Sequence, residues 1–144
     1  MSARLNFYGA APKAMETMMK LSQEANASLE HSLVELVKLR ASQINGCAFC
    51  IKMHTTDALK AGENVDRLFL LDAWRESHLY TDRERAALAW TEALTLLSET
   101  NAPDDVYAAM KEQFSDEEQV KLTLLIGVIN TWNRFAVGFR SVHA

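Results

Sequence analysis

The sequence predicts an all-α fold, and three features of this 144-residue chain support the prediction. Apolar residues recur at spacings of three and four along most of the chain, which is the pattern of amphipathic helices. The segments Thr81–Glu84 and Ser115–Glu118 have the form of capping boxes, which begin helices. No segment alternates apolar and polar residues for long enough to indicate a strand.

Two helices are expected before the turn Asn45-Gly46. Pro12 suits the first turn of a helix that ends near Ala25, because the first helical N–H needs no partner within the helix. Ser28 is expected to cap the second helix, whose sequence is LEHSLVELVKLRASQI. Asparagine and glycine favour turns, so Asn45-Gly46 is expected to break this helix.

Further helices are expected after that turn, and residue types that begin or end helices mark their limits. The segment CAFCIKMHTTDALKA is expected to end at Gly62, and Asn64 is expected to cap the segment VDRLFLLDAWR. The two capping boxes and Pro103 begin the others: one with Ala86, Trp90, Ala93, Leu94 and Leu97, a short one from Pro103 to Met110, and the longest from Ser115 to about Arg140.

Length and composition predict one folded domain that spans residues 1–144. Hydrophobic residues make up 49% of the chain and charged residues 24%, which fits neither a disordered chain nor a membrane protein. The apolar run LLIGVI is too short to span a bilayer, so we expect no membrane association. The net charge of −4 comes from interspersed charges without a basic stripe, and nucleic acid is therefore not an expected partner.

The N-terminal segment MSARLNFYGAAPKAMET lacks the apolar region of a secretory signal. We therefore expect a cytoplasmic protein, and a structural disulfide would be unusual in that compartment. No glycine-rich phosphate loop is present, so we expect no nucleotide, flavin or haem cofactor.

The last expected helix is apolar around most of its circumference. Its sequence LTLLIGVINTWNRFAVGF suits a helix that is buried on most sides. A chain of this length has little interior to surround a helix of roughly 25 residues and about 37 Å. We therefore expect a homo-oligomer, with a well-packed monomer as the alternative. Asn130, Asn133 and Arg134 need polar partners wherever this helix buries them, at an interface, in a cavity or in the core.

The stretch INGCAFCIKMH holds both cysteines of the chain, Cys47 and Cys50, and His54 follows four residues later. Residues three and four apart share one face of a helix, so these three side chains form a line over two turns. The spacing permits a disulfide at a helix start, where the helix dipole favours the thiolate of Cys47. His54 lies one turn beyond Cys50 and is placed to accept or relay its proton.

Glu35 interrupts the apolar sequence Leu33-Val34-Glu35-Leu36-Val37. If the two helices that flank Asn45-Gly46 pack as an antiparallel hairpin, Glu35 and His54 both lie roughly 13–15 Å from the turn. A carboxylate at that depth would fix the tautomer of the imidazole and raise its basicity. The alternative is a solvated Glu35 that pairs with Lys38 or His31.

Glu35, the run Cys47-Ala48-Phe49-Cys50 and His54 together form the pattern E-x11-CxxC-x3-H. With the downstream stretch AWRESHLYTDRERAALAWTEALT, this pattern resembles the alkylhydroperoxidase D (AhpD-like) family of the carboxymuconolactone decarboxylase superfamily. The resemblance covers the chain from about Leu29 to Arg140. It implies an all-helical fold, assembly into trimers or hexamers, and reduction of peroxides with an external dithiol as reductant.

The resemblance also implies a role for each residue of the pattern. Cys50 matches the peroxidatic cysteine and Cys47 the resolving one, while Glu35 and His54 match a proton relay. The helix dipole favours Cys47 as the more acidic thiol, but a positioned base acts on its neighbour, which favours Cys50. Phe49 departs from the family, since characterised members can carry a histidine there. Phe49 transfers no proton, which puts the efficiency of the reaction in doubt more than its class.

Other functions fit the same residues. A thiol-disulfide reductase or redox sensor without peroxide turnover would use identical side chains. A zinc site would take Cys47, Cys50 and His54 as three ligands, but no second CxxC or HxxxH supplies a fourth, which leaves Glu35 or water. The decarboxylase activity of the superfamily needs no CxxC, and packing alone does not explain the spacing of Glu35 and His54.

Overall fold

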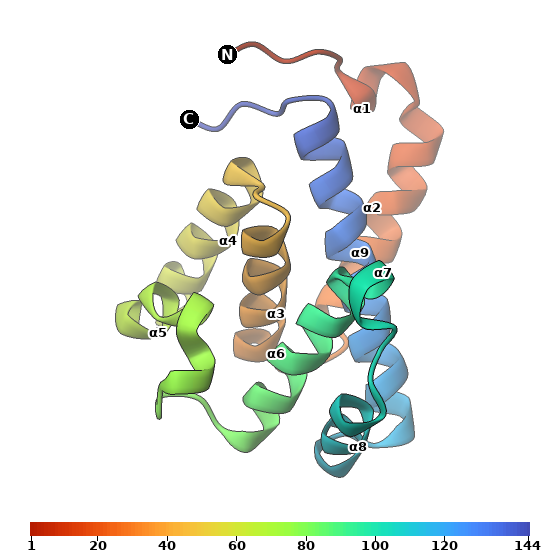
Figure 1. The fold of residues 1–144 in the computed structure, drawn as a ribbon. Helices are drawn as coiled ribbons and strands as arrows, with labels where there is room; N and C mark the ends of the chain where they lie inside the picture. The colour runs from red at the N-terminus through yellow and green to blue at the C-terminus, as the bar shows by residue number, and fades with distance from the viewer.

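The computed structural model describes residues 1–144 and contains helices and no strand, so the prediction of an all-α fold is confirmed (Figure 1). The helices in chain order are α1 (Phe7–Ala10), α2 (Pro12–Asn26), α3 (His31–Ile44), α4 (Ala48–Lys60), α5 (Val65–Phe69), the 3-10 helix η1 (Leu71–Glu76), α6 (Asp82–Thr95), α7 (Leu97–Thr100), α8 (Asp104–Gln113) and α9 (Asp116–Gly138). None of them combines the length and the apolar character that a membrane span requires.

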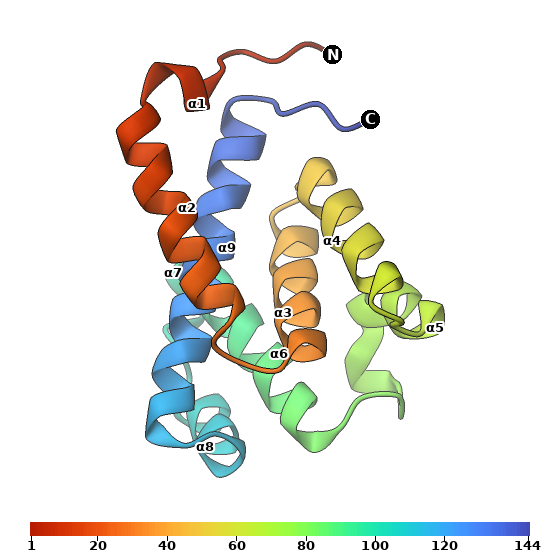
Figure 2. The ribbon, with the colours of Figure 1, turned by 180° about the vertical axis from the view of Figure 1, so that it is seen from behind.

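Helix α3 lies at the centre of the molecule and contacts α4, α6 and α9 (Figure 1). Helix α2 packs along the other side of α9, as the view from behind shows (Figure 2). The N- and C-terminal segments lie at the same end of the molecule, where the backbone N–H of Arg4 donates to the carbonyl of Phe139 at 2.9 Å. The N-terminal segment is thereby held against the end of α9.

Most residues of α3 from Leu33 to Ser42 are buried, because α3 separates two hydrophobic clusters. Its residues Leu33, Val34 and Val37 pack into a large cluster with α2, α6, α8 and α9. Leu36 and Leu39 point the other way, into a smaller cluster with α4, α5 and η1. A polar side chain on α3 is therefore surrounded by packed elements on nearly every side.

The expected caps form at Asn64, Thr81 and Ser115. The side chain of Asn64 accepts from the N–H of Asp66 at 2.9 Å, and Ser115 forms both bonds of its capping box with Glu118. Thr81 accepts from the N–H of Glu84, but the carboxylate of Glu84 binds Arg67 at 2.6 Å instead of returning to Thr81. This box is therefore only half formed, because an ion pair outcompetes the second bond.

Three expected boundaries were wrong. Ser28 does not cap α3, because its hydroxyl donates to the carbonyl of Ala25 and closes α2, so that α3 begins later. The helix expected to include Leu97 ends at Thr95, and α7 follows as a separate turn. The segment expected to follow Asn64 as one helix is divided into α5 and η1, and η1 is itself kinked at Ala73.

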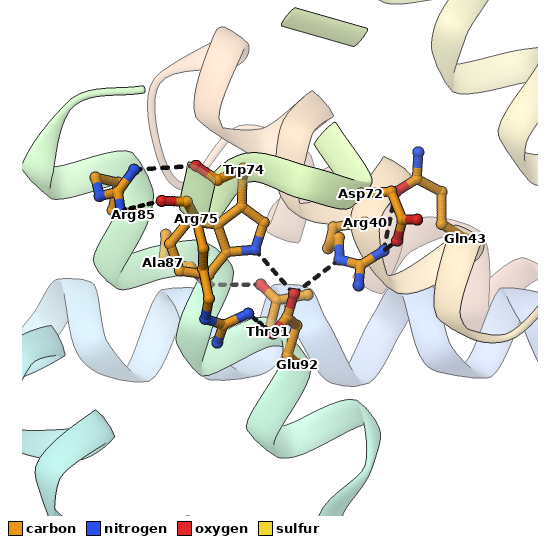
Figure 3. A network of polar contacts seen from close by, with 9 residues as sticks. All are labelled: Arg40, Gln43, Asp72, Trp74, Arg75, Arg85, Ala87, Thr91 and Glu92. Atoms are coloured by element: carbon orange, nitrogen blue, oxygen red, sulfur yellow. Dashed lines mark hydrogen bonds and ion pairs between the residues drawn. The ribbon is translucent and has the colours of Figure 1, made fainter. Parts of the chain in front are cut away.

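A polar network around Glu92 fixes η1 to α3 and α6 (Figure 3). The carboxylate of Glu92 accepts from Trp74 at 2.8 Å, from Arg40 at 2.9 Å and from Arg75 at 2.5 Å. Burial raises the pKa of Glu92, but these three donors outweigh it and the net pKa is lowered. Arg40 also binds Asp72 at 2.8 Å, so the network joins three elements that are distant in the sequence.

The turn Asn45-Gly46 ends α3 and begins α4 within a few residues. Gly46 has a φ of +65°, and its N–H donates to the carbonyl of Gln43 at 3.2 Å. The N–H of Cys47 donates to the carbonyl of Ser42 at 2.9 Å, which completes a Schellman motif at the end of α3. Cys47 is also the N-cap of α4, so this one turn sets the position of the cysteine pair.

We predict that Gly46→Ala destabilises the protein by about 1–2 kcal/mol, because a side chain makes the left-handed backbone unfavourable. The free energy of unfolding, measured in urea by circular dichroism, checks this. Gly138→Ala is the matched control, since that glycine lies in α9 with no atom within 4 Å of the added Cβ, and it should change stability by less than about 0.5 kcal/mol. Equal stability of the two variants would contradict the prediction.

Candidate functional site

Cys47 and Cys50 are joined by a disulfide at the start of α4, with their Cα atoms 5.3 Å apart. Both side chains are buried and pack against Ala136 of α9 and Phe49. The sulfur of Cys47 also accepts from the N–H of Cys50 at 3.2 Å, as an N-cap side chain does. The pair thus stands where the spacing predicts, at a helix N-terminus.

Asparagine side chains attach this turn to α9. The amide of Asn45 donates to the side-chain oxygens of Asn130 and Asn133, at 2.9 Å in each case. Asn133 donates to the hydroxyl of Ser42 at 3.0 Å, and Asn130 donates to that of Thr95 at 3.1 Å. The polar residues of α9 are thus paired inside the subunit, where they hold the cysteine turn in place. Sequence reasoning noted their need for partners but did not find Asn45.

The structure brings Glu35 of α3 and His54 of α4 together, as their equal depth from the turn predicts. Oε2 of Glu35 lies 3.3 Å from Nδ1 of His54, and the two residues are only 5% and 6% exposed. Neither atom has a fully formed hydrogen bond, so the contact is electrostatic in character. The alternative of a solvated Glu35 is wrong, because Glu35 is buried, but Lys38, one of the two partners which that alternative named, does pair with it.

Lys38 completes a buried group of three charged or titratable side chains. Its ammonium lies 3.2 Å from Oε1 of Glu35 and donates to the side-chain oxygen of Asn26, on α2, at 3.1 Å. Sequence reasoning considered Lys38 only as a surface partner of Glu35. The signal that could have found it is its place in the apolar run Leu36-Val37-Lys38-Leu39, which lies on the buried part of α3.

The neighbours of Glu35 keep its carboxyl group ionised. Burial raises its pKa, but the contact with His54 and the positive charge of Lys38 outweigh burial, and the net pKa lies below the ordinary 4.5. A carboxylate whose folded pKa is lowered stabilises the fold above its unfolded pKa, and that contribution is lost as the pH falls through the folded pKa. Glu35 is therefore an anion at neutral pH.

A cavity of about 340 Å³ opens onto Cys50 and His54. Its walls come from α1, α2, α4 and α9 and are mostly hydrophobic, with four aromatic side chains: Phe7, Tyr8, Phe49 and Trp132. Lys38 and Asn26 also line it. Cys47 does not line this cavity and faces a separate hollow beside Gly46 and Ala136. A small molecule in the cavity beside His54 would therefore meet Cys50 and not Cys47.

The zinc alternative lacks a set of donors. No group of three or more His, Cys, Asp or Glu side chains converges in an arrangement that holds a metal ion. Both sulfurs are joined to each other, and Nδ1 of His54 faces Glu35.

Comparisons with known proteins assign the family. Residues 12–93 match the carboxymuconolactone decarboxylase family, and the protein YdfG of Bacillus subtilis is 42% identical over 138 residues, which are 95% of this chain and 94% of YdfG. A crystal structure from Agrobacterium tumefaciens, proposed to be the antioxidant defence protein AhpD, has a TM-score of 0.96 and 49% identity over 99% of both chains. The chain belongs to the carboxymuconolactone decarboxylase family, and its fold is AhpD-like.

A more distant solved structure shares the fold alone. The debrominase Bmp8 superposes with a TM-score of 0.85 at 20% identity, over 94% of this chain and 74% of its own. The AhpD-like helical scaffold therefore recurs in proteins whose sequences have diverged widely.

We predict that Glu35→Gln destabilises the protein by about 3–5 kcal/mol at neutral pH, because it leaves the buried ammonium of Lys38 without its carboxylate. The double variant Glu35→Gln/Lys38→Met removes both charges and should be more stable than Glu35→Gln alone. Urea unfolding by circular dichroism measures both. The exposed pair Glu16 and Lys20 is the control, and its removal should cost less than about 0.5 kcal/mol. If the destabilisation of the double variant equals the sum of the destabilisations that Glu35→Gln and Lys38→Met cause separately, the prediction is contradicted.

Proposed function

We propose that this protein is a thiol-dependent peroxidase of the alkyl hydroperoxide reductase type. The observation that carries the proposal is that Cys50 and His54 line one apolar cavity while Glu35 stands behind His54. Cys47 is bonded to Cys50 and lies outside that cavity, as a resolving cysteine would. The proposed catalytic residues are therefore Glu35, Cys47, Cys50 and His54.

The first step uses the imidazole as a base. His54 takes the proton of the Cys50 thiol, and Glu35 holds the imidazole through Nδ1. The thiolate attacks the terminal oxygen of a hydroperoxide, so that an S–O bond forms and the O–O bond breaks. The alkoxide that leaves takes the proton from His54 and departs as an alcohol. Cys50 is left as a sulfenic acid.

The second step regenerates the enzyme. The thiol of Cys47 attacks the sulfenic sulfur, an S–S bond forms, and the hydroxyl leaves as water with the proton of Cys47. An external dithiol then reduces the disulfide by exchange and is itself oxidised. The disulfide present in the structure corresponds to the oxidised form of this cycle.

The shape of the cavity favours an organic hydroperoxide over hydrogen peroxide. Its volume of about 340 Å³ and its aromatic walls suit an alkyl or aryl group. Burial of such a group contributes about 25 cal/mol for each Å² of apolar surface, which hydrogen peroxide does not gain. Phe49 contributes to this apolar wall and transfers no proton, so Glu35 and His54 are the acid–base groups in this proposal.

A second function, thiol–disulfide exchange without peroxide turnover, would use the same residues. Cys47 and Cys50 are only 1% and 2% exposed, which favours a small substrate over the disulfide of a folded protein. The similarity to the Agrobacterium tumefaciens protein that is proposed to be the antioxidant defence protein AhpD supports the peroxidase. We also propose that the protein is cytoplasmic, because dithiols are kept reduced in that compartment. Residues 1–144 form one functional domain in this proposal.

We predict that Cys50→Ser abolishes peroxide consumption, because no thiolate then faces the cavity. Cys47→Ser should permit one oxidation and leave a sulfenic acid on Cys50 that dimedone traps. His54→Gln should lower the rate by about 10²–10⁴, the usual loss for a positioned acid–base group, while His31→Gln, outside the cavity, should not. Consumption of cumene hydroperoxide with small dithiol donors and mass spectrometry after limiting peroxide measure these effects.

Two results would contradict this mechanism. If Cys50→Ser is oxidised at Cys47 while Cys47→Ser stays unmodified, the two cysteines have exchanged roles. If the wild-type protein reduces disulfides of small molecules but consumes no peroxide, the second function is correct. The compound 2,3,4-tribromopyrrole, which is bound in a structure of the debrominase Bmp8, serves as a further test substrate.

We also propose that the protein is a homo-oligomer, a trimer or a dimer-based hexamer. Helix α9 contacts α2, α3, α4, α6 and α8 within the subunit, yet part of its apolar surface stays uncovered. On the uncovered face Val120 is 70% exposed, and Leu124, one turn later, is also exposed. The groove beside Val120 and Leu124 continues onto Trp90 and Tyr107. A second subunit on this face would cover the apolar surface that the sequence pattern leaves unexplained.

We predict that Val120→Glu/Leu124→Glu reduces the size of the assembly, because it introduces charges into an apolar contact. Light scattering at several concentrations measures the mass. The control is Phe69→Ser on α5, an exposed apolar residue away from α9, which should leave the mass unchanged. A wild-type mass equal to the 16.2 kDa of one chain would overturn the proposal.

A further inference from the structure

Lys38 is the buried charge to which the proposed reaction assigns no role. Lysine is almost never fully buried unless its ammonium is paired, and Lys38 is only 7% exposed. Its ammonium lies 3.2 Å from Oε1 of Glu35 and donates to Oδ1 of Asn26 at 3.1 Å. Its side chain lines the same cavity as Cys50 and His54. A buried charge beside a reactive cysteine is a candidate functional group.

The other charges near Glu35 do not replace Lys38. On the side away from His54, Glu35 lines a polar cavity of about 400 Å³ that it shares with further titratable groups, namely His31 of α3, Glu63 after α4, Arg67 of α5 and Glu84 of α6. Arg67 is bound by Glu63 at 2.8 Å and by Glu84 at 2.6 Å. Asp57 of α4 lines the first cavity beside Lys38. Lys38 is thus the one ammonium or guanidinium group in contact with Glu35.

We propose that Lys38 is a positioning residue that keeps Glu35 ionised, so that His54 presents an unprotonated nitrogen to Cys50. The proposal deepens the proposed function, since it concerns the same relay. Because Nδ1 faces Glu35, Nε2 is the ring nitrogen left for the cavity. An ionised Glu35 can only accept from an N–H at Nδ1, so it favours the tautomer that carries the proton on Nδ1 and leaves the lone pair of Nε2 free to accept a proton.

A neutral Glu35 would reverse this arrangement. A protonated carboxyl can donate to Nδ1, which moves the ring proton to Nε2 and turns Nε2 into a donor. It could then no longer take the proton of Cys50. Burial favours the neutral carboxyl, and an adjacent ammonium opposes that effect. Lys38 therefore sets how far the pH can fall before the relay fails.

Asn26 extends this arrangement to the wall of the cavity. It lies at the end of α2, which also contributes Met19 and Ser22 to the lining. The bond from Lys38 to Asn26 joins this wall to Glu35 through one side chain. Asn26 holds the ammonium in position but carries no charge of its own. A substitution of Asn26 therefore changes the position of the ammonium without removing its charge.

The test is the pH dependence of Cys50 reactivity in full-length, reduced Cys47→Ser protein. Alkylation by iodoacetamide reports the Cys50 thiolate, and ¹³C NMR of the glutamate carboxyls follows the titration of Glu35. In Lys38→Met the pKa of Glu35 should rise, because burial is then opposed by His54 alone. The acid limb is the part of the profile in which the alkylation rate falls as the pH is lowered, and it should move to higher pH by as much as the pKa of Glu35 rises. At the acidic end of the profile, the rate of Lys38→Met should approach that of Glu35→Gln.

The control variants separate charge from packing. Lys38→Arg should restore the wild-type acid limb, and Asn26→Ala should lower the rate without moving the limb, because it leaves the ammonium beside Glu35. Circular dichroism confirms that each variant is folded. If Lys38→Met lowers the rate equally at every pH, or leaves the titration of Glu35 unchanged, Lys38 has only a structural role and the proposal is overturned.

Neither measurement requires a peroxide, so the two proposals fail separately. A protein that consumes no peroxide but shows the shifted acid limb would refute the peroxidase and support the role of Lys38. If the protein consumes cumene hydroperoxide but the acid limb is the same in wild type and Lys38→Met, the peroxidase is supported and the role of Lys38 is refuted.

Discussion

The junction between α3 and α4 is the constraint on which the site depends. A left-handed Gly46 reverses the chain so tightly that Cys47 both closes α3 and caps α4. The same reversal sets the two helices antiparallel and in one register, which brings Glu35 and His54 to the same depth. Hydrogen bonds from Asn45 attach the turn to α9 and thereby hold α3 and α4 in a fixed alignment. One turn therefore places the disulfide, the base and the carboxylate together.

The central position of α3 explains why charged groups occur inside so small a protein. Helix α3 separates two hydrophobic clusters and is covered by α4, α6, α9 and η1. Glu35 and Lys38 are one turn apart on it and neutralise each other where neither would be stable alone. Leu36 and Leu39 next to them pack into the smaller cluster and fix the helix against α4. The energetic cost of the buried charges is met by packing on both sides of the same helix.

The cavity combines this charged interior with an apolar wall of separate origin. Phe7 and Tyr8 come from the N-terminal segment, whereas Trp132 comes from α9, and their rings are in mutual contact or linked through Phe135. These aromatic residues limit which molecules can reach Cys50, whereas α3 and α4 carry the proposed acid–base groups Glu35 and His54. The helical scaffold recurs in a structure that is only 20% identical to this chain. Three of the four aromatic residues of the wall, Phe7, Tyr8 and Trp132, lie outside the hairpin of α3 and α4.

The sequence alone determined the helices, the position of the cysteine pair at a helix start and the pairing of Glu35 with His54, because each depends on local periodicity or on distance from one turn. The prediction that Ser28 caps α3 was wrong because Ser28 lies between the end of one helix and the start of the next and can bond to either. In the structure its hydroxyl donates to Ala25 at the end of α2. Tertiary structure decided that Lys38 is buried and that Asn133 binds Ser42, because those partners lie on helices whose relative rotation no local pattern encodes. It likewise decided which sulfur faces the cavity, since most of the aromatic wall, namely Phe7, Tyr8 and Trp132, comes from segments far away in the sequence.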